Sequence, residues 1–186
     1  MNKTFLRILI VIGLTTLACS IFVGGPLYPS TPIPVSSDAA QSLHEQLDQA
    51  LATGTQTGSI TLRISESQLT SYLTYYLGTQ ADPVITNPEV LLRNGQAQIF
   101  GEAQGGLLTA NISLTLQVNV DAAGRPQIVI TKTDFGPLPV PPNLDETVST
   151  LIQEAFTGAL GPAATGFRLE TVSLSDGFMT VTGRVR

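Results

Sequence analysis

The sequence predicts an α+β fold in which amphipathic helices pack on an antiparallel β-sheet. Residues 108–120 alternate apolar and polar side chains without interruption, which is typical of a strand with one buried face. Residues 66–78 carry apolar side chains at helical spacing. An Asn-Gly pair at 94–95 and an Asp-Gly pair at 176–177 each separate two strand-like runs, as tight hairpin turns do. Because a two-residue turn joins antiparallel neighbours, the sheet is expected to be antiparallel.

The composition restricts the classes of protein and of site. The chain has 186 residues, of which 42% are apolar and 12% charged, so it fits one globular domain rather than a disordered chain. Nine Lys and Arg against fourteen Asp and Glu argue against nucleic acid as a partner. A single Cys rules out a disulfide within the chain, and a single His rules out a multi-histidine metal site. No cofactor and no metal are therefore expected.

The N-terminus has the layout of a membrane tether. Lys3 and Arg7 precede residues 8–23, which carry no charge. The next basic residue is Arg63, so the positive-inside rule places the N-terminus in the cytoplasm and the rest of the chain on the extracytoplasmic side. Residues 1–23 are expected to hold the protein at the cell membrane. Without the two cations of the tether, the remainder has a net charge of -7, which anionic headgroups repel.

Two kinds of tether fit these residues. Residues 15–19 resemble a loose bacterial lipobox, in which Cys19 becomes the lipidated first residue of a lipoprotein. However, the apolar run continues through residues 21–23, and residues 5–23 come close to the ~20 residues that a spanning helix needs. We favour the second interpretation, a single-pass signal anchor in which Cys19 has no special role.

Prolines and a helix-capping residue predict the first elements after the tether. Residues 24–36 contain four prolines and predict an extended extracytoplasmic linker, followed by a domain over residues 37–186. Ser37 or Asp38 is expected to start a helix that ends near Ala52.

A strand and a second helix follow. Residues 59–65 alternate and predict a strand. Ser65 and Gln68 form a capping box that opens the second helix, and Gly78 ends it. The apolar stripe of this helix comprises Leu69, Tyr72, Leu73, Tyr76 and Leu77.

The rest of the chain is mostly strand. Residues 90–103 predict a hairpin, and residues 108–120 a strand of about 40 Å at ~3.3 Å per residue, aliphatic on one face and uncharged on the other. Residues 127–135 return as its antiparallel partner. Residues 143–160 predict a third helix, and residues 167–185 a closing hairpin.

The two hairpins repeat one pattern. The first reads Val-x-Leu-x-Asn-Gly from residue 90 and Ile-x-Gly from residue 99; the second reads Val-x-Leu-x-Asp-Gly from residue 172 and Val-x-Gly from residue 181. Since each also follows an apolar-faced helix, the pattern favours a duplicated helix-plus-hairpin unit. Chance similarity between two generic hairpins is the alternative.

No residue pattern indicates catalysis. His44 lies on the first predicted helix with no nucleophile motif around it, and we expect it to face water. The chain has no nucleophile elbow, no phosphate-binding loop and no paired-histidine motif. The protein is therefore not expected to be an enzyme.

Three segments resemble a family of bacterial envelope proteins. Residues 64–73, reading ISESQLTSYL, are similar to the helix start of the LmeA-like and YpmS-like extracytoplasmic families. Residues 136–141, reading GPLPVP, resemble their Gly-x-Leu-Pro-x-Pro corner, and residues 172–183 resemble their terminal hairpin. These families belong to the tubular lipid-binding (TULIP) superfamily, and the resemblance covers residues 60–186.

The resemblance implies a long, curved antiparallel sheet wrapped around one or two amphipathic helices, with acyl chains held between them. The chain has room for one such module, so a shallow groove or a homodimer is expected in place of an enclosed tunnel. Independently, burying a chain in an aliphatic groove gains ~0.8 kcal/mol per CH₂ and needs no charged residue.

We therefore expect a tethered protein that binds or shuttles phospholipid or glycolipid. The expected groove residues are Leu69, Leu73, Tyr76 and Leu77 of the second helix, Ile112, Leu114, Leu116 and Val118 of the long strand, and Val148, Ile152 and Phe156 of the third helix. The alternative is an envelope scaffold with a solid core, which would bind a protein partner through a sheet edge or the polar face of the long strand.

Overall fold

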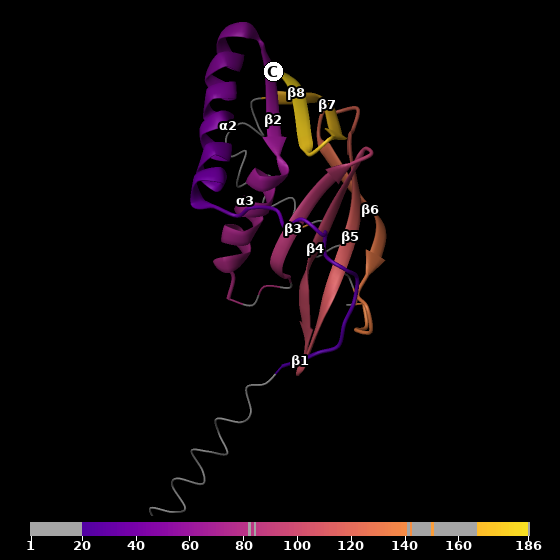
Figure 1. Cartoon of the computed structure of the whole chain (residues 1–186). Coiled ribbons are helices and arrows are strands. Elements are labelled where there is room, and N and C mark those ends of the chain that lie inside the picture. The colour runs from indigo at the N-terminus through magenta and orange to yellow at the C-terminus, as the bar shows by residue number, and fades with distance from the viewer. Residues whose placement is uncertain are drawn as a thin grey trace, which may run out of the picture.

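The computed structural model describes residues 20–81, 83, 85–140, 142, 150 and 167–185, and it has the predicted α+β class (Figure 1). Two sheets, antiparallel apart from the short strand β1, form a curled surface with two helices packed against it. The elements are β1 (Ile21–Phe22), α2 (Ser37–Thr57), β2 (Ser59–Ser65), α3 (Glu66–Gly78), β3 (Thr86–Arg93), β4 (Gln96–Gly105), β5 (Leu108–Val120), β6 (Pro126–Asp134), β7 (Phe167–Ser175) and β8 (Phe178–Val185). The third predicted helix, at residues 143–160, lies outside the described residues.

The larger sheet is built around the long strand β5. Strand β4 pairs with β5 from Ala97 to Gly105, and β3 pairs with β4 through the predicted Asn-Gly hairpin. On the other edge of β5, β6 pairs with its second half, and the short β1 pairs in parallel with its first residues, Leu108 and Thr109. Strand β1 therefore covers the part of the edge that β6 leaves open.

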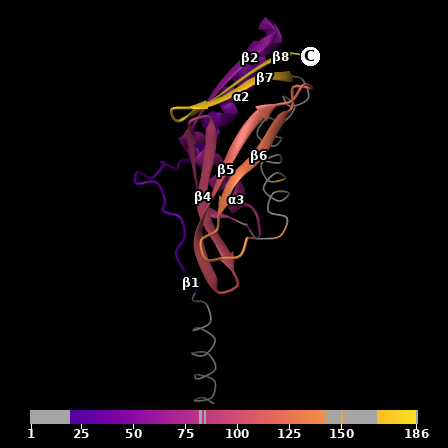
Figure 2. The same cartoon turned by 90° about the vertical axis from the view of Figure 1, so that its right-hand side faces the viewer.

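The smaller sheet joins segments that are far apart in the sequence. Strands β7 and β8 form the closing hairpin, and β2 pairs with β8 along its whole length, from Ser59 beside Arg184 to Ser65 beside Phe178. Figure 2 shows β2, β7 and β8 crossing above the long strands of the larger sheet. The fold is therefore closed by contacts between its beginning and its end.

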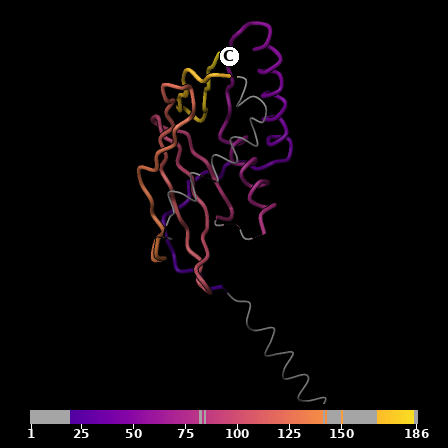
Figure 3. Tube along the Cα trace, turned by 180° about the vertical axis from the view of Figure 1, so that it is seen from behind, coloured from indigo at the N-terminus to yellow at the C-terminus, as the bar shows by residue number. Residues whose placement is uncertain are grey.

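The two helices start at the predicted residues. The Ser36 hydroxyl accepts a hydrogen bond from the Ala39 amide at the start of α2, and Ser65 and Gln68 complete the capping box of α3. Helix α2 runs beyond the expected Ala52 as far as Thr57, and Gly58, with φ 77°, forms its left-handed cap. Figure 3 shows α2 standing on the side away from the long strands.

The hairpin repeat extends to the strand that pairs beside each hairpin. Gly101 of β4 lies opposite Ile112 of β5, and Gly183 of β8 lies opposite Ile60 of β2. Gly101 and Gly183 are the matching glycines of the two repeats. The register is the same on both sides, and the Gly95 amide donates to the Leu174 carbonyl as the Gly177 amide does to the Leu92 carbonyl. We therefore infer a pseudo-two-fold axis that relates β3–β4–β5 to β7–β8–β2, which favours duplication over chance similarity.

The segment of residues 20–36, here called the N-terminal segment, packs on the domain. The Val23 amide donates to the Thr109 carbonyl at 2.8 Å, and the Asn111 amide donates to the Gly24 carbonyl at 2.9 Å. Further along, the Ser36 amide donates to the Ser71 hydroxyl of α3 at 3.1 Å. The predicted linker is extended as expected, but it lies along the sheet rather than standing away from it.

This arrangement also shortens the predicted tether. Residues 21–23 were expected to continue the membrane segment, yet Ile21 and Phe22 form β1 and Val23 extends its hydrogen bonding. Within the described part of the chain, no helix is long and apolar enough to cross a membrane. Residues 1–19, including Cys19, lie outside it.

Buried apolar side chains form two main clusters. The larger one lies between α3 and the five-stranded sheet, with Leu92, Ile112 and Leu114 at its centre. The smaller one lies between α2 and the three-stranded sheet. Leu69 and Met179 are the partly buried residues that pack against both clusters, so the junction of the two sheets runs past these side chains.

Candidate functional site

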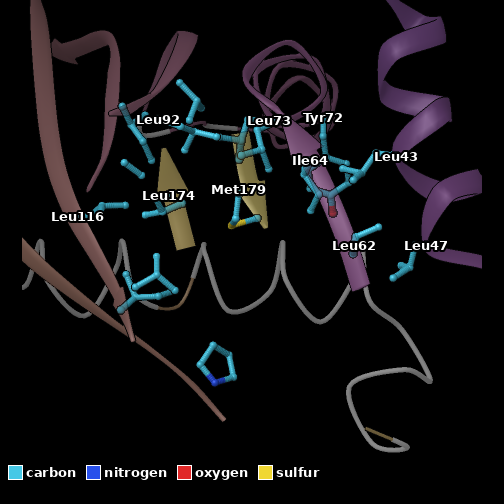
Figure 4. A pocket seen from close by; sticks show the side chains of 17 residues that line it. Leu43, Leu47, Leu62, Ile64, Tyr72, Leu73, Leu92, Leu116, Leu174 and Met179 are labelled. Carbon is cyan, nitrogen blue, oxygen red and sulfur yellow. The ribbon is translucent and has the colours of Figure 1, made fainter. Parts of the chain in front are cut away.

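An apolar cavity of about 140 Å³ lies at this junction. The 17 residues around it come from both helices and from every strand except β1 (Figure 4). They are Leu43, Leu47, Leu62, Ile64, Leu69, Tyr72, Leu73, Val90, Leu92, Ala97, Ile99, Leu116, Val118, Pro126, Ile128, Leu174 and Met179.

Regular alternation in the strands points these side chains inward. On β2, Leu62 and Ile64 are buried while Arg63 between them is exposed. On α2, Leu43 and Leu47 lie four residues apart and are both buried, so they cover the cavity from the helix side. In Figure 4, Leu92, Leu116 and Leu174 close it from the opposite side.

Equivalent residues of the two related halves line the cavity. Leu92 and Leu174 hold the same position in the two hairpins and both line it. The axis also relates two pairs of cross-strand neighbours, because Ala97 lies opposite Leu116 and Met179 lies opposite Ile64. All four side chains line the cavity. Ala97 is therefore a small lining residue whose counterpart in the other half is the larger Met179.

The described lining contains no charged side chain, and its one polar side chain is Tyr72. The Tyr72 ring stacks on Tyr76 with 6.0 Å between centroids and meets His44 edge-on at 5.8 Å. Burial, and then the neighbouring Tyr76, raise the pKa of Tyr72. Tyr75 is 48% exposed, and His44 is exposed, as expected from the sequence.

A buried carboxylate fixes one end of the cavity wall. Glu66, 9% exposed at the start of α3, accepts a hydrogen bond from the Leu92 amide at 2.6 Å. The same carboxylate forms an ion pair with Arg93. In addition, the Glu66 amide donates to the Gly177 carbonyl of the second hairpin at 3.0 Å. The first turn of α3 therefore ties both hairpins together beside Leu92.

The predicted groove residues divide into three groups. Leu69, Leu73, Leu116 and Val118 line the cavity. Tyr76, Leu77, Ile112 and Leu114 instead pack in the larger core cluster. Val148, Ile152 and Phe156 lie outside the described residues.

Sequence reasoning missed the lining from α2, β2 and the two hairpins. The alternation of residues 60–64 correctly indicated a buried face, and Leu43 and Leu47, four residues apart, are both buried. These local patterns did not indicate which elements the buried faces pack against, because β2 pairs with β8 more than a hundred residues later in the sequence.

The size and lining of the cavity limit its chemistry. An apolar cavity of about 150 Å³ stays dry and admits a benzene-sized molecule, so this one admits a group of about six carbon atoms. Burying six methylenes from water would gain about 5 kcal/mol. Among the described residues, no cluster of three or more His, Cys, Asp or Glu could hold a metal ion.

No protein-family model and no curated protein matches this chain.

Proposed function

We propose that this protein is a membrane-tethered, extracytoplasmic binder of phospholipid-like molecules, which holds part of an acyl chain in the cavity and performs no catalysis. The observation that supports this best is the cavity itself. A domain interior is normally close-packed, whereas here both cores border one apolar space. Among the described residues the lining has no charged side chain, and its one polar side chain is Tyr72, so it favours an apolar ligand.

The lining also suggests how an acyl chain enters. Val118, Pro126 and Ile128 on β5 and β6 are partly exposed, so the apolar wall continues to the surface. An acyl chain longer than about six carbons would leave the cavity on this side. The interior of a bilayer is as apolar as the cavity, so the free energy of moving an acyl chain between the two is small. A small free energy of transfer favours exchange of lipid with a membrane over tight binding.

The modest volume favours a second candidate, an envelope scaffold in which the cavity is a packing defect. Ligand sites usually span about 300–1,000 Å³, more than the cavity offers. Such a protein would bind a partner instead, through the outer polar face of β5 or an exposed sheet edge.

Photolabelling separates the two candidates. The full chain is reconstituted in phosphatidylcholine vesicles that contain a phosphatidylcholine with a diazirine midway along one acyl chain. Labelled peptides are then mapped by mass spectrometry. We expect label on β4, β5 and β8, around Ala97, Leu116 and Met179.

The deciding variant is Ala97→Met. It copies the residue on the other side of the pseudo-two-fold axis and fills the cavity with an unbranched side chain. We expect it to stay folded and to lose cavity labelling several-fold. Leu169→Met is the matched control, since Leu169 packs on the smaller core without lining the cavity.

Label that falls only on residues 1–19 would overturn lipid binding and favour the scaffold. Equal cavity labelling in the wild type and a folded Ala97→Met variant would overturn the site. Label on residues 1–19 serves as an internal standard, because the tether contacts the bilayer whether or not the cavity is occupied.

A further inference from the structure

Four large apolar side chains are exposed together at one end of the larger sheet. Ile21 and Phe22 are each 59% exposed, Leu107 is 64% exposed and Leu108 is 38% exposed. We call these four residues the apolar tip. Pairing holds them in place, because Ile21 lies beside Leu108 and its amide donates to the Leu107 carbonyl at 2.7 Å.

The apolar tip lies in an uncharged part of the protein. The sequence has no charged residue from 20 to 37 and none between Glu102 and Asp121. The nearest carboxylates along the sheet are Glu102, which pairs with Asn111, and Asp134, which pairs with Ser113. Since Asn111 is three residues beyond Leu108, the uncharged end is about 10 Å tall at ~3.3 Å per residue.

The tip is also where the uncharged N-terminal run enters the domain. Residues 8–23 carry no charge, and the last three of them pair with β5 at the tip. In Figures 1 and 2, β1 lies at the opposite end of the molecule from β2, β7 and β8. A tether that ends at residue 19 would leave the tip next to the surface in which the tether is held.

We propose that the apolar tip inserts into the outer leaflet of the membrane and stands the domain upright on it. A lipid surface favours exposed apolar side chains that have no charge nearby. It also accommodates the uncharged run of residues 8–23 that leads into the tip, so we favour a membrane over a second copy of the chain. Interfacial elements typically bury about 5–10 Å, which matches the height of the uncharged end. The carboxylates of Glu102 and Asp134 would stay at the level of the headgroups.

Upright insertion also determines the distance between the cavity and the membrane. Leu116 lies eight residues beyond Leu108 on β5, which places the cavity about 26 Å above the tip at ~3.3 Å per residue. An acyl chain would then have to leave the bilayer to reach it. The inference rests on the proposed function for the membrane tether alone and does not require an occupied cavity.

Tryptophan fluorescence tests the insertion, because the chain contains no Trp. Leu107→Trp and Phe22→Trp each place one probe at the tip of the full chain, reconstituted in phosphatidylcholine vesicles with or without brominated acyl chains. The control is Val129→Trp, since Val129 is 48% exposed and pairs with Gln117, nine residues beyond Leu108. The readouts are the emission maximum and its quenching by bromine.

We expect both tip probes to emit at shorter wavelength and to be quenched several-fold, and the Val129→Trp probe to do neither. Adding Phe22→Asp to the Leu107→Trp variant should abolish the quenching, with an unchanged far-ultraviolet circular dichroism spectrum as the folding control. Absence of quenching at both tip positions would overturn insertion, and so would equal quenching at all three positions. A blue shift that depends on protein concentration without quenching would assign the tip to a second copy of the chain, which also overturns the proposal.

The two experiments fail independently. Quenched tip probes with an unlabelled cavity would overturn lipid binding and keep the insertion. A labelled cavity with unquenched probes would do the reverse.

Discussion

Gly95 and Gly177 make the same hydrogen bond across the pseudo-two-fold axis. The Gly95 amide donates to the Leu174 carbonyl at 2.9 Å, and the Gly177 amide donates to the Leu92 carbonyl at 3.0 Å. Both glycines have positive φ, 76° and 82°, as the second residue of their turns. Each hairpin turn therefore binds the strand end of the other hairpin, and the two sheets are joined where Leu92 and Leu174 line the cavity.

Substituting these glycines should weaken the junction unequally. Gly95→Ala places a Cβ in open space and should cost about 1 kcal/mol through its positive φ alone. Gly177→Ala should cost more, because its Cβ would also lie 3.3 Å from Glu66 Oε2. Urea unfolding measures both. Gly78→Ala is the control, since Gly78 ends a helix in open space and the change should gain up to about 0.5 kcal/mol. Equal losses at Gly95 and Gly177 would contradict the role of the Glu66 contact.

The Glu66 carboxylate should contribute more than an exposed ion pair does. Glu66→Gln keeps an acceptor for the Leu92 amide but removes the charge that pairs with Arg93, so we expect a loss of about 1–2 kcal/mol in the free energy of unfolding. Glu170→Gln removes the exposed pair with Arg184 and should cost less than about 0.5 kcal/mol. The result would contradict the bridging role of Glu66 if the two variants unfolded at the same urea concentration.

Exchanging two side chains across the axis tests the symmetry of the cavity. Met179→Ala enlarges the cavity and should destabilise the protein by about 2 kcal/mol. Combining it with Ala97→Met restores the volume on the other side of the axis, so the double variant should regain most of that loss. Thermal unfolding measures the series. A double variant as unstable as Met179→Ala would show that the two positions do not share one space.

The N-terminal segment should detach from the sheet when Gly25 gains a side chain. A Cβ at Gly25 would lie 2.1 Å from the Asn111 carbonyl oxygen, whereas a Cβ at Gly24 would meet nothing within 4 Å. Both residues have positive φ, so Gly24→Ala controls for backbone strain. We expect hydrogen exchange at the Asn111 amide, which donates to the Gly24 carbonyl, to accelerate strongly in Gly25→Ala and little in Gly24→Ala. Unchanged protection in both variants would contradict the packing of this segment.

Ionisation of Tyr28 should release the same segment at high pH. Burial, and then the charges of Glu102 and Glu89, raise the pKa of Tyr28 from 10.0 to about 12. Because the pKa is higher in the docked state, the stabilisation is complete below pH 10 and is lost as the pH rises from 10 to about 12. The difference between the ultraviolet titrations of wild type and Tyr28→Phe isolates this group. A midpoint at pH 10 in that difference would mean that the hydroxyl does not stay docked against the Asn87 carbonyl.

Elements with local signals were predicted almost to the residue. The strand at Ser59–Ser65, the helix at Glu66–Gly78 and the closing hairpin at residues 167–185 all have the expected bounds, because alternation, a capping box and an Asp-Gly turn each act over a few residues. The pairing of β2 with β8 and of β1 with β5 was not predicted. Both connect distant segments, and β1 lies in a run whose apolar character suggested a membrane helix.

The candidate site was predicted in part for the same reason. Leu69, Leu73, Leu116 and Val118 were found because they lie on faces that any packing of helix on sheet would bury. Ile112 and Leu114 lie on the same face of β5 as Leu116, yet they pack in closed core. The position of the cavity along a buried face depends on how the two sheets pack against each other. The periodicity of a single strand does not predict that packing.

The pairing of β2 with β8 also determines when the protein can complete its structure during synthesis. Strand β2 leaves the ribosome roughly a hundred residues before its partner does, an interval of about 5–20 s at ~5–20 residues per second. Throughout that time β2 has an unpaired edge, and the apolar face of α2 has no finished sheet beneath it. A nascent chain in this condition exposes apolar surface that chaperones can bind. Release of β8 from the ribosome is the event that ends this open phase.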